Sequence, residues 1–240
     1  MRALVLGGTG EGKRVATGLH ERGVEVTYSV ADPQARADVP CTVRRGGFGG
    51  CEGLAQTLSD GDYTLLVDST HPYAATISAN ARAAADRSGL ALWAVRRPPW
   101  QPQAGDRWTT LTAGTSAREA AAGWQRPLFT VGPSPLDEAP IPAGQHWFVR
   151  CLPDHGRDEP ANCTILGQRG PFGTDDEKAL FTLLGIDGLV TRNSGGAAVA
   201  AKLVVARELG IPVRMEPRPT LPAADRAFET PEALLEALAP

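Results

Sequence analysis

The first residues of the chain join a short apolar run to a cluster of glycines. Ala3–Leu6 has the character of a buried parallel strand, and Gly7, Gly8, Gly10 and Gly12 follow it before a helical pattern begins. Glycines let a phosphate approach the main chain, and the first N–H groups of a new helix, at the positive end of its dipole, bind an anion. The spacing therefore predicts a nucleotide phosphate site. Its expected residues are Gly8, Thr9, Gly10, Glu11 and Gly12.

Two nucleotide-binding motifs compete for this loop. Gly7, Gly12 and Lys13 match the G-x-x-x-x-G-K part of a P-loop, but Arg14 stands where a P-loop has the Ser or Thr that binds Mg²⁺. The glycines at positions 8, 10 and 12 instead give a variant of the dinucleotide loop, whose usual spacing is G-x-G-x-x-G. A glycine turn with a purely structural role is the third alternative.

The end of the second predicted strand bears on the choice of nucleotide. An NAD site has an acidic residue about 20 positions after the glycines, which binds the ribose hydroxyls. Here the strand ends near Ser29, and the arginines that follow, Arg36, Arg44 and Arg45, suit a 2′-phosphate. Asp32 is the counter-evidence, but it lies past the strand end, where an aspartate commonly serves a turn. We therefore expect NADPH, with Ser29 in its site.

Two further loops carry groups suited to a cofactor. In residues 46–50 four glycines surround one aromatic ring, so a flat ligand can approach the backbone and stack on the ring; the candidates are Gly47, Phe48 and Gly49. Residues 68–73 follow a predicted strand and open a helix, at the sheet edge where open α/β folds bind ligands; the candidates are Thr70, His71 and Pro72. The structural alternatives are a flexible surface loop for the first segment, and helix capping by Asp68 or Ser69 for the second.

The second half of the chain repeats the pattern of a strand end followed by glycines. Residues 191–196 end a predicted strand and open a helix that contains Lys202. A second anion site facing the first predicts a cleft between two domains, with Asn193, Ser194 and Gly195 reaching the cofactor. Residues 167–172 precede another helix, whose first turn is acidic at positions 175–177; acidic residues there stabilise a helix start.

Strand patterns alternate with helical patterns, which is typical of an α/β fold with parallel sheets. The strands predicted before residue 96 are Ala3–Leu6, Glu25–Val30, Thr42–Arg44, Thr64–Val67 and Ala91–Val95, with helices near Gly12–Arg22, Cys51–Leu58 and Tyr73–Ser88. The later strands are Trp108–Leu111, Leu128–Val131, Trp147–Val149, Thr164–Leu166, Gly188–Thr191 and Pro212–Met215, with helices at Asp175–Leu184 and Ala197–Leu209 and a closing helix capped by Thr230. The prolines within residues 96–102 interrupt regular structure. We predict two Rossmann-like domains with largely parallel sheets: an NADP-binding domain at residues 1–98, and residues 99–240, which complete the cofactor and substrate cleft.

Composition restricts the classes of partner. The net charge of −3 argues against a nucleic-acid binder, and no apolar run approaches the roughly 20 residues that cross a bilayer. The N-terminus lacks the pattern of a signal peptide, so we expect a cytoplasmic protein, and we expect a monomer. The four cysteines form no C-x-x-C pair and indicate neither a metal site nor a disulfide framework. The 21 arginines against 3 lysines reflect either a GC-rich genome or the need for bidentate binding of carboxylates and phosphates.

Together and in this order, the motifs resemble the precorrin-6A reductase family of cobalamin biosynthesis. The blocks that carry the resemblance are residues 6–12, 46–50, 68–74, 97–100, 170–172 and 189–196. Two features depart from the family pattern: Arg192 stands where many members have Lys, and the region after Ser29 is longer than the family's Ser-Leu-Ala-Gly-Arg stretch.

The resemblance implies NADPH-dependent reduction of one double bond of a tetrapyrrole, with hydride delivered to one carbon and a proton to its neighbour. A macrocycle with many carboxylates needs Arg side chains and helix N-termini around its rim, for which the candidates are Arg97, Arg150, Arg169, Arg192 and Lys202; Gly170 is a further candidate substrate-binding residue. The proton donor is unassigned; His71, Tyr73, Asp176 and Lys202 are candidates, and water or a substrate carboxyl can suffice. The rival functions are a P-loop-like nucleotide hydrolase and a non-catalytic NADP-sensing module.

Overall fold

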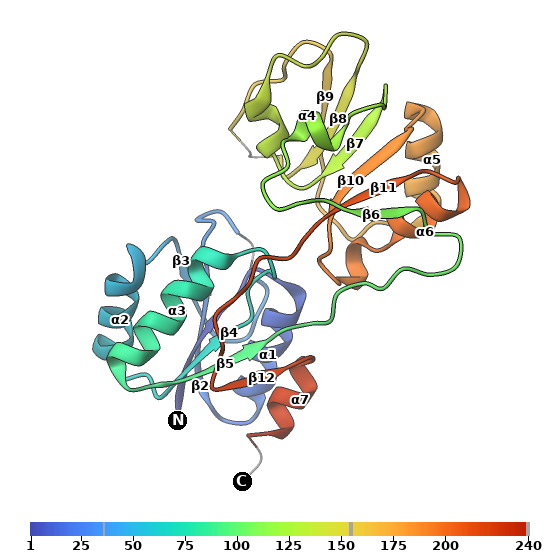
Figure 1. The fold of residues 1–240 in the computed structure, drawn as a ribbon. Coiled ribbons are helices and arrows are strands. Elements are labelled where there is room, and N and C mark those ends of the chain that lie inside the picture. Colours follow the sequence, from blue (N-terminus) through green and yellow to red (C-terminus); the bar gives the residue numbers. More distant parts are fainter. Residues whose placement is uncertain (36, 154–155, 239–240) are drawn as a thin grey trace. The chain divides into compact units, whose positions relative to one another are not determined.

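The computed structural model describes residues 1–35, 37–153 and 156–238, which divide into two compact units (Figure 1). One unit consists of Met1–Pro98 and Pro219–Pro240, and the other of Pro99–Arg218. Each unit contains a six-stranded sheet, and all of the described strand pairs are parallel. The predicted α/β class with Rossmann-like parallel sheets is confirmed.

The first sheet has the strand order β12-β5-β4-β1-β2-β3. Its strands are β1 (Arg2–Leu6), β2 (Glu25–Val30), β3 (Thr42–Arg45), β4 (Leu65–Asp68), β5 (Ala91–Val95) and β12 (Arg226–Phe228). Its helices are α1 (Gly10–Glu21), α2 (Gly50–Asp60), α3 (Ala75–Ser88) and α7 (Pro231–Glu236). Strands β2 and β3 are added on one side of β1, and the next strands in the chain, β4 and β5, are added on its other side. The strand order therefore reverses between β1 and β4, and in doubly wound sheets ligands bind at the carboxyl ends of the strands at such a point.

Both faces of this sheet are covered, which explains why β1 is a continuous apolar run. Ala3, Leu4 and Val5 are each 0% exposed. Ala3 and Val5 pack in one apolar cluster with α1 and α7, and Leu4 packs in another with α2 and α3. The rigid centre of the unit is thus the strand that carries the glycine loop at its end.

The second sheet has the order β6-β11-β10-β7-β8-β9. Its strands are β6 (Trp108–Thr110), β7 (Pro127–Thr130), β8 (Trp147–Cys151), β9 (Cys163–Gly167), β10 (Gly188–Arg192) and β11 (Val213–Glu216). The helical segments are α4 (Ala117–Ala120), η1 (Ser134–Glu138), α5 (Thr174–Leu184), η2 (Ala197–Val199) and α6 (Ala201–Glu208). This sheet repeats the reversal of the first, here between β7 and β10.

The structure corrects the predicted limits of the second domain, which was expected to extend to residue 240. The last 22 residues belong to the first unit, because β12 pairs with β5 and α7 packs against α1 (Figure 1). In turn β6, which follows β5 in the chain, pairs with β11 in the second sheet. The first sheet therefore takes its edge strand β12 from the part of the chain that follows the second unit, whereas β6 belongs to the second unit itself.

The pairing of β12 with β5 has a local physical basis. Arg226 lies over the ring of Trp93, 4.6 Å from its centroid, and Phe228 packs against the same ring at 5.4 Å. A three-residue strand of this composition has no apolar alternation, so the sequence analysis did not predict it.

Most other elements begin and end within a few residues of their predicted positions. The helix predicted at Ala197–Leu209 is divided into η2 and α6, and α4 and η1 were not predicted. The predicted cap of the closing helix is confirmed, since the Thr230 hydroxyl accepts a hydrogen bond from Ala233 N at 3.2 Å. None of the described helices is both long and apolar enough to cross a membrane.

Candidate functional site

A cavity of about 520 Å³ opens at the carboxyl edge of the first sheet. It is lined by the ends of β1 and β2, by the glycine loop at residues 46–50, and by the segment from Thr70 to Asn80 that leads into α3. The sequence-predicted residues that line it are Gly8, Ser29, Gly47, Phe48, Gly49, Thr70, His71 and Tyr73. Ile77 and Asn80 also line it. They were not predicted because they lie inside helix α3 and not at the end of a strand, where ligand-binding residues were expected.

Fewer main-chain N–H groups are available to a ligand beside this cavity than the sequence predicted, because two of them already donate to side chains of the protein. Gly8 N donates to the Tyr28 hydroxyl at 2.9 Å, and Gly12 N donates to the Thr9 hydroxyl at 3.0 Å. By contrast, the N–H groups of Thr9, Gly10 and Glu11 donate to no residue that the structure describes. Three consecutive free donors at the start of α1 form an anion site of the kind that binds a diphosphate.

Packing explains the glycines of this loop. A Cβ at Gly7 would lie 2.1 Å from Cε2 of the buried Tyr28, and a Cβ at Gly12 would lie 3.1 Å from Gly7 Cα. Gly8 has a φ of +101°, which side chains rarely adopt. A Cβ at Gly10 meets no atom within 4 Å. The space in front of Gly10 is thus left for a ligand, whereas Gly7 and Gly12 are required by the fold.

Asp68 organises the neighbouring strand end. Its carboxylate is 0% exposed; Oδ1 accepts from Thr70 N at 3.1 Å and Thr70 Oγ1 at 2.6 Å, and Oδ2 accepts from Ser78 Oγ at 2.6 Å and Arg96 Nη2 at 2.5 Å. Burial raises the pKa of Asp68, but the hydrogen bond and charge of Arg96, with Ser78 and Thr70, outweigh it and hold the pKa below its usual value. Asp68 is therefore ionised at neutral pH and fixes Thr70 at the cavity. It is not the cap of α3, whose N-cap residue is Ala74.

Glu11 and Arg97 bond to each other. Arg97 Nη1 lies 2.7 Å from Glu11 Oε2, with 15% and 22% of the two side chains exposed. Both line a small hollow of about 10 Å³ together with the predicted residues Thr9 and Pro72. The sequence analysis assigned Glu11 to the cofactor and Arg97 to the substrate, and the structure brings them together at the start of α1.

The two described arginines predicted for the 2′-phosphate have different surroundings. The Arg44 guanidinium lies 3.8 Å from the Phe48 ring centroid and donates to the carbonyls of Gly46 and Gly47, at 2.7 and 2.9 Å. Arg45 is exposed and makes one long bond, from Nε to the Ala35 carbonyl at 3.3 Å.

Arg44 thus holds the glycine loop, and Arg45 is the better placed for a phosphate. Arg36 lies outside the described residues. The turn role of Asp32 is confirmed, since its carboxylate accepts from Gln34 N at 2.8 Å.

The loop after β10 belongs to the second unit, whereas the residues that line the cavity all belong to the first. The Asn193 side chain bonds both main-chain groups of Trp100, accepting from its N at 2.7 Å and donating to its O at 3.1 Å. Arg192 Nε lies 3.0 Å from Glu216 Oε2. Ser194 is buried, and Gly195 has a positive φ of 69°. These contacts connect the loop to Trp100 and to Glu216 of β11.

A buried ion pair that was not predicted from the sequence lies at the carboxyl edge of the second sheet. Arg150 Nη1 is 2.7 Å from Glu177 Oε1, with only 6% and 2% of the side chains exposed. Glu177 was predicted merely to stabilise the start of α5. Its exposed neighbour Asp176 keeps that role. The available signal was Arg150 itself, a charged residue at the end of an apolar strand.

The remaining predicted substrate-binding residues, Arg169, Gly170 and Lys202, also belong to the second unit. Arg169 is exposed in the loop after β9, and Gly170 follows it. Lys202 is 6% exposed in the first turn of α6.

The comparisons with known proteins agree over almost the whole chain. The sequence profile of the precorrin-6x reductase CbiJ/CobK family matches residues 2–239. A precorrin-6A reductase of Rhodococcus erythropolis is 39% identical over 231 residues, covering 95% of this chain and 93% of that protein. A precorrin-6A reductase of Mycobacterium tuberculosis H37Rv is 40% identical over 238 residues, with the same coverage of 95% and 93%.

A solved structure described as CobK precorrin-6A reductase superposes with a TM-score of 0.87 at 35% identity, covering 99% of this chain and 96% of that chain. Fold and sequence profile agree, and the chain belongs to the precorrin-6x reductase CbiJ/CobK family.

Proposed function

We propose that this protein is an NADPH-dependent precorrin-6A reductase, an oxidoreductase that reduces one ring double bond of a tetrapyrrole in cobalamin biosynthesis. The observation that carries the proposal is the row of free N–H groups at Thr9, Gly10 and Glu11, beside a cavity of about 520 Å³ at the point where the strand order reverses. The family membership supplies the reaction class.

The first unit binds the dinucleotide. The free amides at the start of α1 bind the diphosphate, and the cavity takes one nucleoside against Phe48, Thr70 and His71. NADPH supplies the hydride, so the protein has to provide positioning. Arg45 selects NADPH over NADH, because its exposed guanidinium can bind a 2′-phosphate bidentately.

Asn193, Ser194 and Gly195 of the second unit are further proposed cofactor-binding residues. The proposed substrate-binding residues are Arg97 of the first unit and Arg169, Gly170, Arg192 and Lys202 of the second. The candidate proton donors are His71 and Tyr73 at the cavity, and Asp176 and Lys202 in the second unit.

A second dinucleotide site in the second unit is disfavoured by its corresponding turn. After β7 the chain continues through Gly132 and Pro133 into η1, a 3-10 helix of five residues. Proline has no N–H group, so this turn cannot offer the row of donors found after β1. The second unit is therefore assigned to the substrate.

Binding of NADPH and NADH, measured by quenching of tryptophan fluorescence with and without a tetrapyrrole polycarboxylate, tests the proposal. We expect NADPH to bind at least tenfold more tightly than NADH, and to be oxidised when precorrin-6A is added. Protection from thermal unfolding by Mg-ATP but not by NADPH would instead favour a nucleotide hydrolase. Binding of NADPH without any binding of a tetrapyrrole would favour a cofactor-sensing module.

A further inference from the structure

Three charged side chains from different elements meet at the carboxyl edge of the second sheet. Arg150 comes from the end of β8, Glu177 from the first turn of α5 and Lys202 from the first turn of α6. They are 6%, 2% and 6% exposed, and the charges of both Arg150 and Glu177 act on Lys202. We refer to these three residues as the Lys202 cluster.

The Lys202 cluster has more positive charge than it can balance. Arg150 and Glu177 neutralise each other, which leaves the ammonium of Lys202. Within the described part of the chain Lys202 makes no hydrogen bond or ion pair; its recorded contact is with the ring of Trp100, 5.6 Å from Nζ to the centroid. An unpaired buried ammonium is costly, and native proteins keep such groups mainly where they have a function.

Two further atoms of the cluster also lack partners. Arg150 Nε and Glu177 Oε2 are buried and bond to no described group. Buried polar atoms are nearly always hydrogen-bonded, so an unbonded donor, an unbonded acceptor and an unpaired cation in one cluster call for an explanation. An anionic ligand would satisfy the unbonded donor and the unpaired cation.

Aromatic rings limit access of water to the cluster. The Arg150 guanidinium lies 4.3 Å from the Phe172 ring centroid, and Trp100 lies beside Lys202. Phe172 N donates to the Ala198 carbonyl at 3.1 Å, which ties its loop to η2 just before α6. Burial and the charge of Arg150 lower the pKa of Lys202, the charge of Glu177 opposes them, and the net result is a pKa of about 7.

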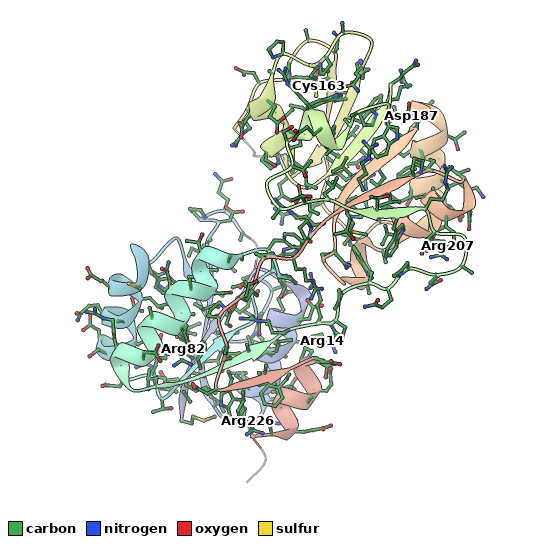
Figure 2. The ribbon with its side chains drawn as sticks, viewed as in Figure 1. Arg14, Arg82, Cys163, Asp187, Arg207 and Arg226 are labelled. Atoms are coloured by element: carbon green, nitrogen blue, oxygen red, sulfur yellow. The ribbon has the colours of Figure 1, made fainter. Side chains whose placement is uncertain are left out.

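The other charged groups of α6 do not compensate Lys202. Arg207, labelled in Figure 2, bonds Asp106 with Nε and Oδ1 2.9 Å apart, and Glu208 bonds Lys178 at 2.9 Å. Both pairs lie at the other end of the helix, more than one turn from Lys202.

We propose that Lys202, with the Arg150–Glu177 pair beside it, binds one carboxylate of the substrate, and that Lys202 takes up a proton when this carboxylate arrives. The inference rests on the proposed function for the identity of the ligand. Once Lys202 is protonated, the cluster has a single unbalanced positive charge, which one carboxylate matches and a phosphate dianion would exceed. The arriving carboxylate can accept from Lys202 Nζ and, after a small rotation, from Arg150 Nε.

The competing explanation is that Lys202 pairs permanently with Glu177 Oε2 after a small side-chain movement. The two explanations differ in the protonation of the free protein. A permanent pair holds the pKa of Lys202 at or above its ordinary value, whereas a site that awaits an anion leaves it titrating near neutral pH.

The composition of the chain allows a direct measurement, because it has only 3 lysines, at positions 13, 178 and 202. Protein labelled with ¹³C at lysine Cε gives three resonances, assigned with Lys13→Arg, Lys178→Arg and Lys202→Arg. In the free protein we expect Lys202 to titrate near 7 and Lys178 above its ordinary range. Saturating uroporphyrin III, an octacarboxylate tetrapyrrole, should raise the pKa of Lys202 by at least one unit and leave Lys13 unchanged.

Lys202→Met tests the same site without labelling. The variant should bind uroporphyrin III at least tenfold more weakly at pH 6.5 and bind NADPH as the wild type does. Lys178→Met is the matched control and should change neither affinity. Calorimetry of uroporphyrin III binding at pH 8, in buffers of different ionisation enthalpy, should record net proton uptake in the wild type and none in Lys202→Met.

Each outcome decides between the proposals. A Lys202 that titrates at 10 or above in the free protein overturns the carboxylate site. Bound uroporphyrin III with an unchanged Lys202 resonance also overturns it and leaves the proposed reductase function standing. A response to saturating succinate in the absence of porphyrin binding would support the carboxylate site and count against the tetrapyrrole substrate.

Discussion

Arg97 Nη1 lies 2.7 Å from Glu11 Oε2, at the start of the helix that carries the three free main-chain donors. Glu11 contributes one of those donors through its N–H group, and its carboxylate would repel a diphosphate bound there. The ion pair with Arg97 neutralises this carboxylate while keeping it at the favourable end of the helix dipole. If the proposed diphosphate binds at these donors, Arg97 therefore acts on it through Glu11.

The double substitution of this pair tests the relationship. Arg97→Gln should weaken NADPH binding by about tenfold, since the freed Glu11 carboxylate then faces the diphosphate. Arg97→Gln with Glu11→Gln should restore most of the lost affinity, as judged by titration of cofactor fluorescence. If the double variant binds no better than Arg97→Gln, Arg97 acts by another route.

Gly10→Asp should remain folded and lose NADPH affinity. A Cβ at Gly10 meets nothing within 4 Å, and an aspartate in the first turn stabilises a helix, so the fold tolerates it. Its carboxylate would stand in the diphosphate site and cost about 10- to 100-fold in affinity. Gly10→Ala is the control and should bind within a fewfold of the wild type. Unchanged affinity of Gly10→Asp in calorimetry would show that the diphosphate binds elsewhere.

Substitutions of Arg45 and Arg44 should distinguish a residue that selects the cofactor from one that holds the glycine loop. Arg45→Gln should weaken NADPH binding by about 10- to 100-fold, the usual value of a charge-assisted phosphate contact, and leave NADH binding unchanged. Arg44→Gln removes the bonds to the carbonyls of Gly46 and Gly47, so it should weaken both cofactors alike. The reverse pattern, with selectivity lost only in Arg44→Gln, would assign the 2′-phosphate to Arg44.

Asp68→Asn should destabilise the protein by about 3–5 kcal/mol at neutral pH, because it leaves the charge of Arg96 unpaired. The pKa of Asp68 is lowered in the folded protein, so its carboxylate contributes stability above the unfolded value of about 3.9, and this contribution is lost as pH falls through the lower folded value. The gap between wild type and variant, measured by urea unfolding, should therefore be constant from neutral pH to about pH 5 and shrink in more acidic solution. A gap that does not depend on pH would mean that Asp68 is not ionised. Ser78→Ala, as a control, should cost only about 1 kcal/mol.

Lys202→Met should stabilise the free protein by about 1–4 kcal/mol at pH 6, since an unpaired buried charge is replaced by an apolar side chain of similar length. The folded pKa of about 7 lies below the unfolded value of about 10.4, so the wild type binds fewer protons when folded, and its stability rises between these values. The advantage of Lys202→Met should accordingly be largest below pH 7 and shrink toward pH 10. Urea unfolding at three pH values measures this, and a destabilised variant at pH 6 would indicate a permanent Lys202–Glu177 pair.

Local patterns in the sequence determined much of the first unit. Continuous apolar runs bounded by glycines identify buried parallel strands, and the polar groups that follow them lie at one sheet edge because parallel strands share their carboxyl ends. For this reason Gly8, Ser29 and Thr70, which are far apart in the sequence, were all predicted for the site and all line the same cavity. The cap at Thr230 and the turn at Asp32 were likewise predictable, since each depends on residues only a few positions away.

Only the tertiary structure decided which of these groups are available and which are already bonded. The Gly8 amide is bonded to Tyr28, which lies 20 positions away in the sequence. Glu177 is buried against Arg150, 27 positions away, whereas its neighbour Asp176 is exposed. These differences depend on distant residues and not on the local pattern. The edge strand β12 was equally invisible, because its three residues gain their stability from β5 rather than from their own pattern. Local propensity specifies elements, whereas charge pairing and edge pairing are set by long-range contacts that only folding creates.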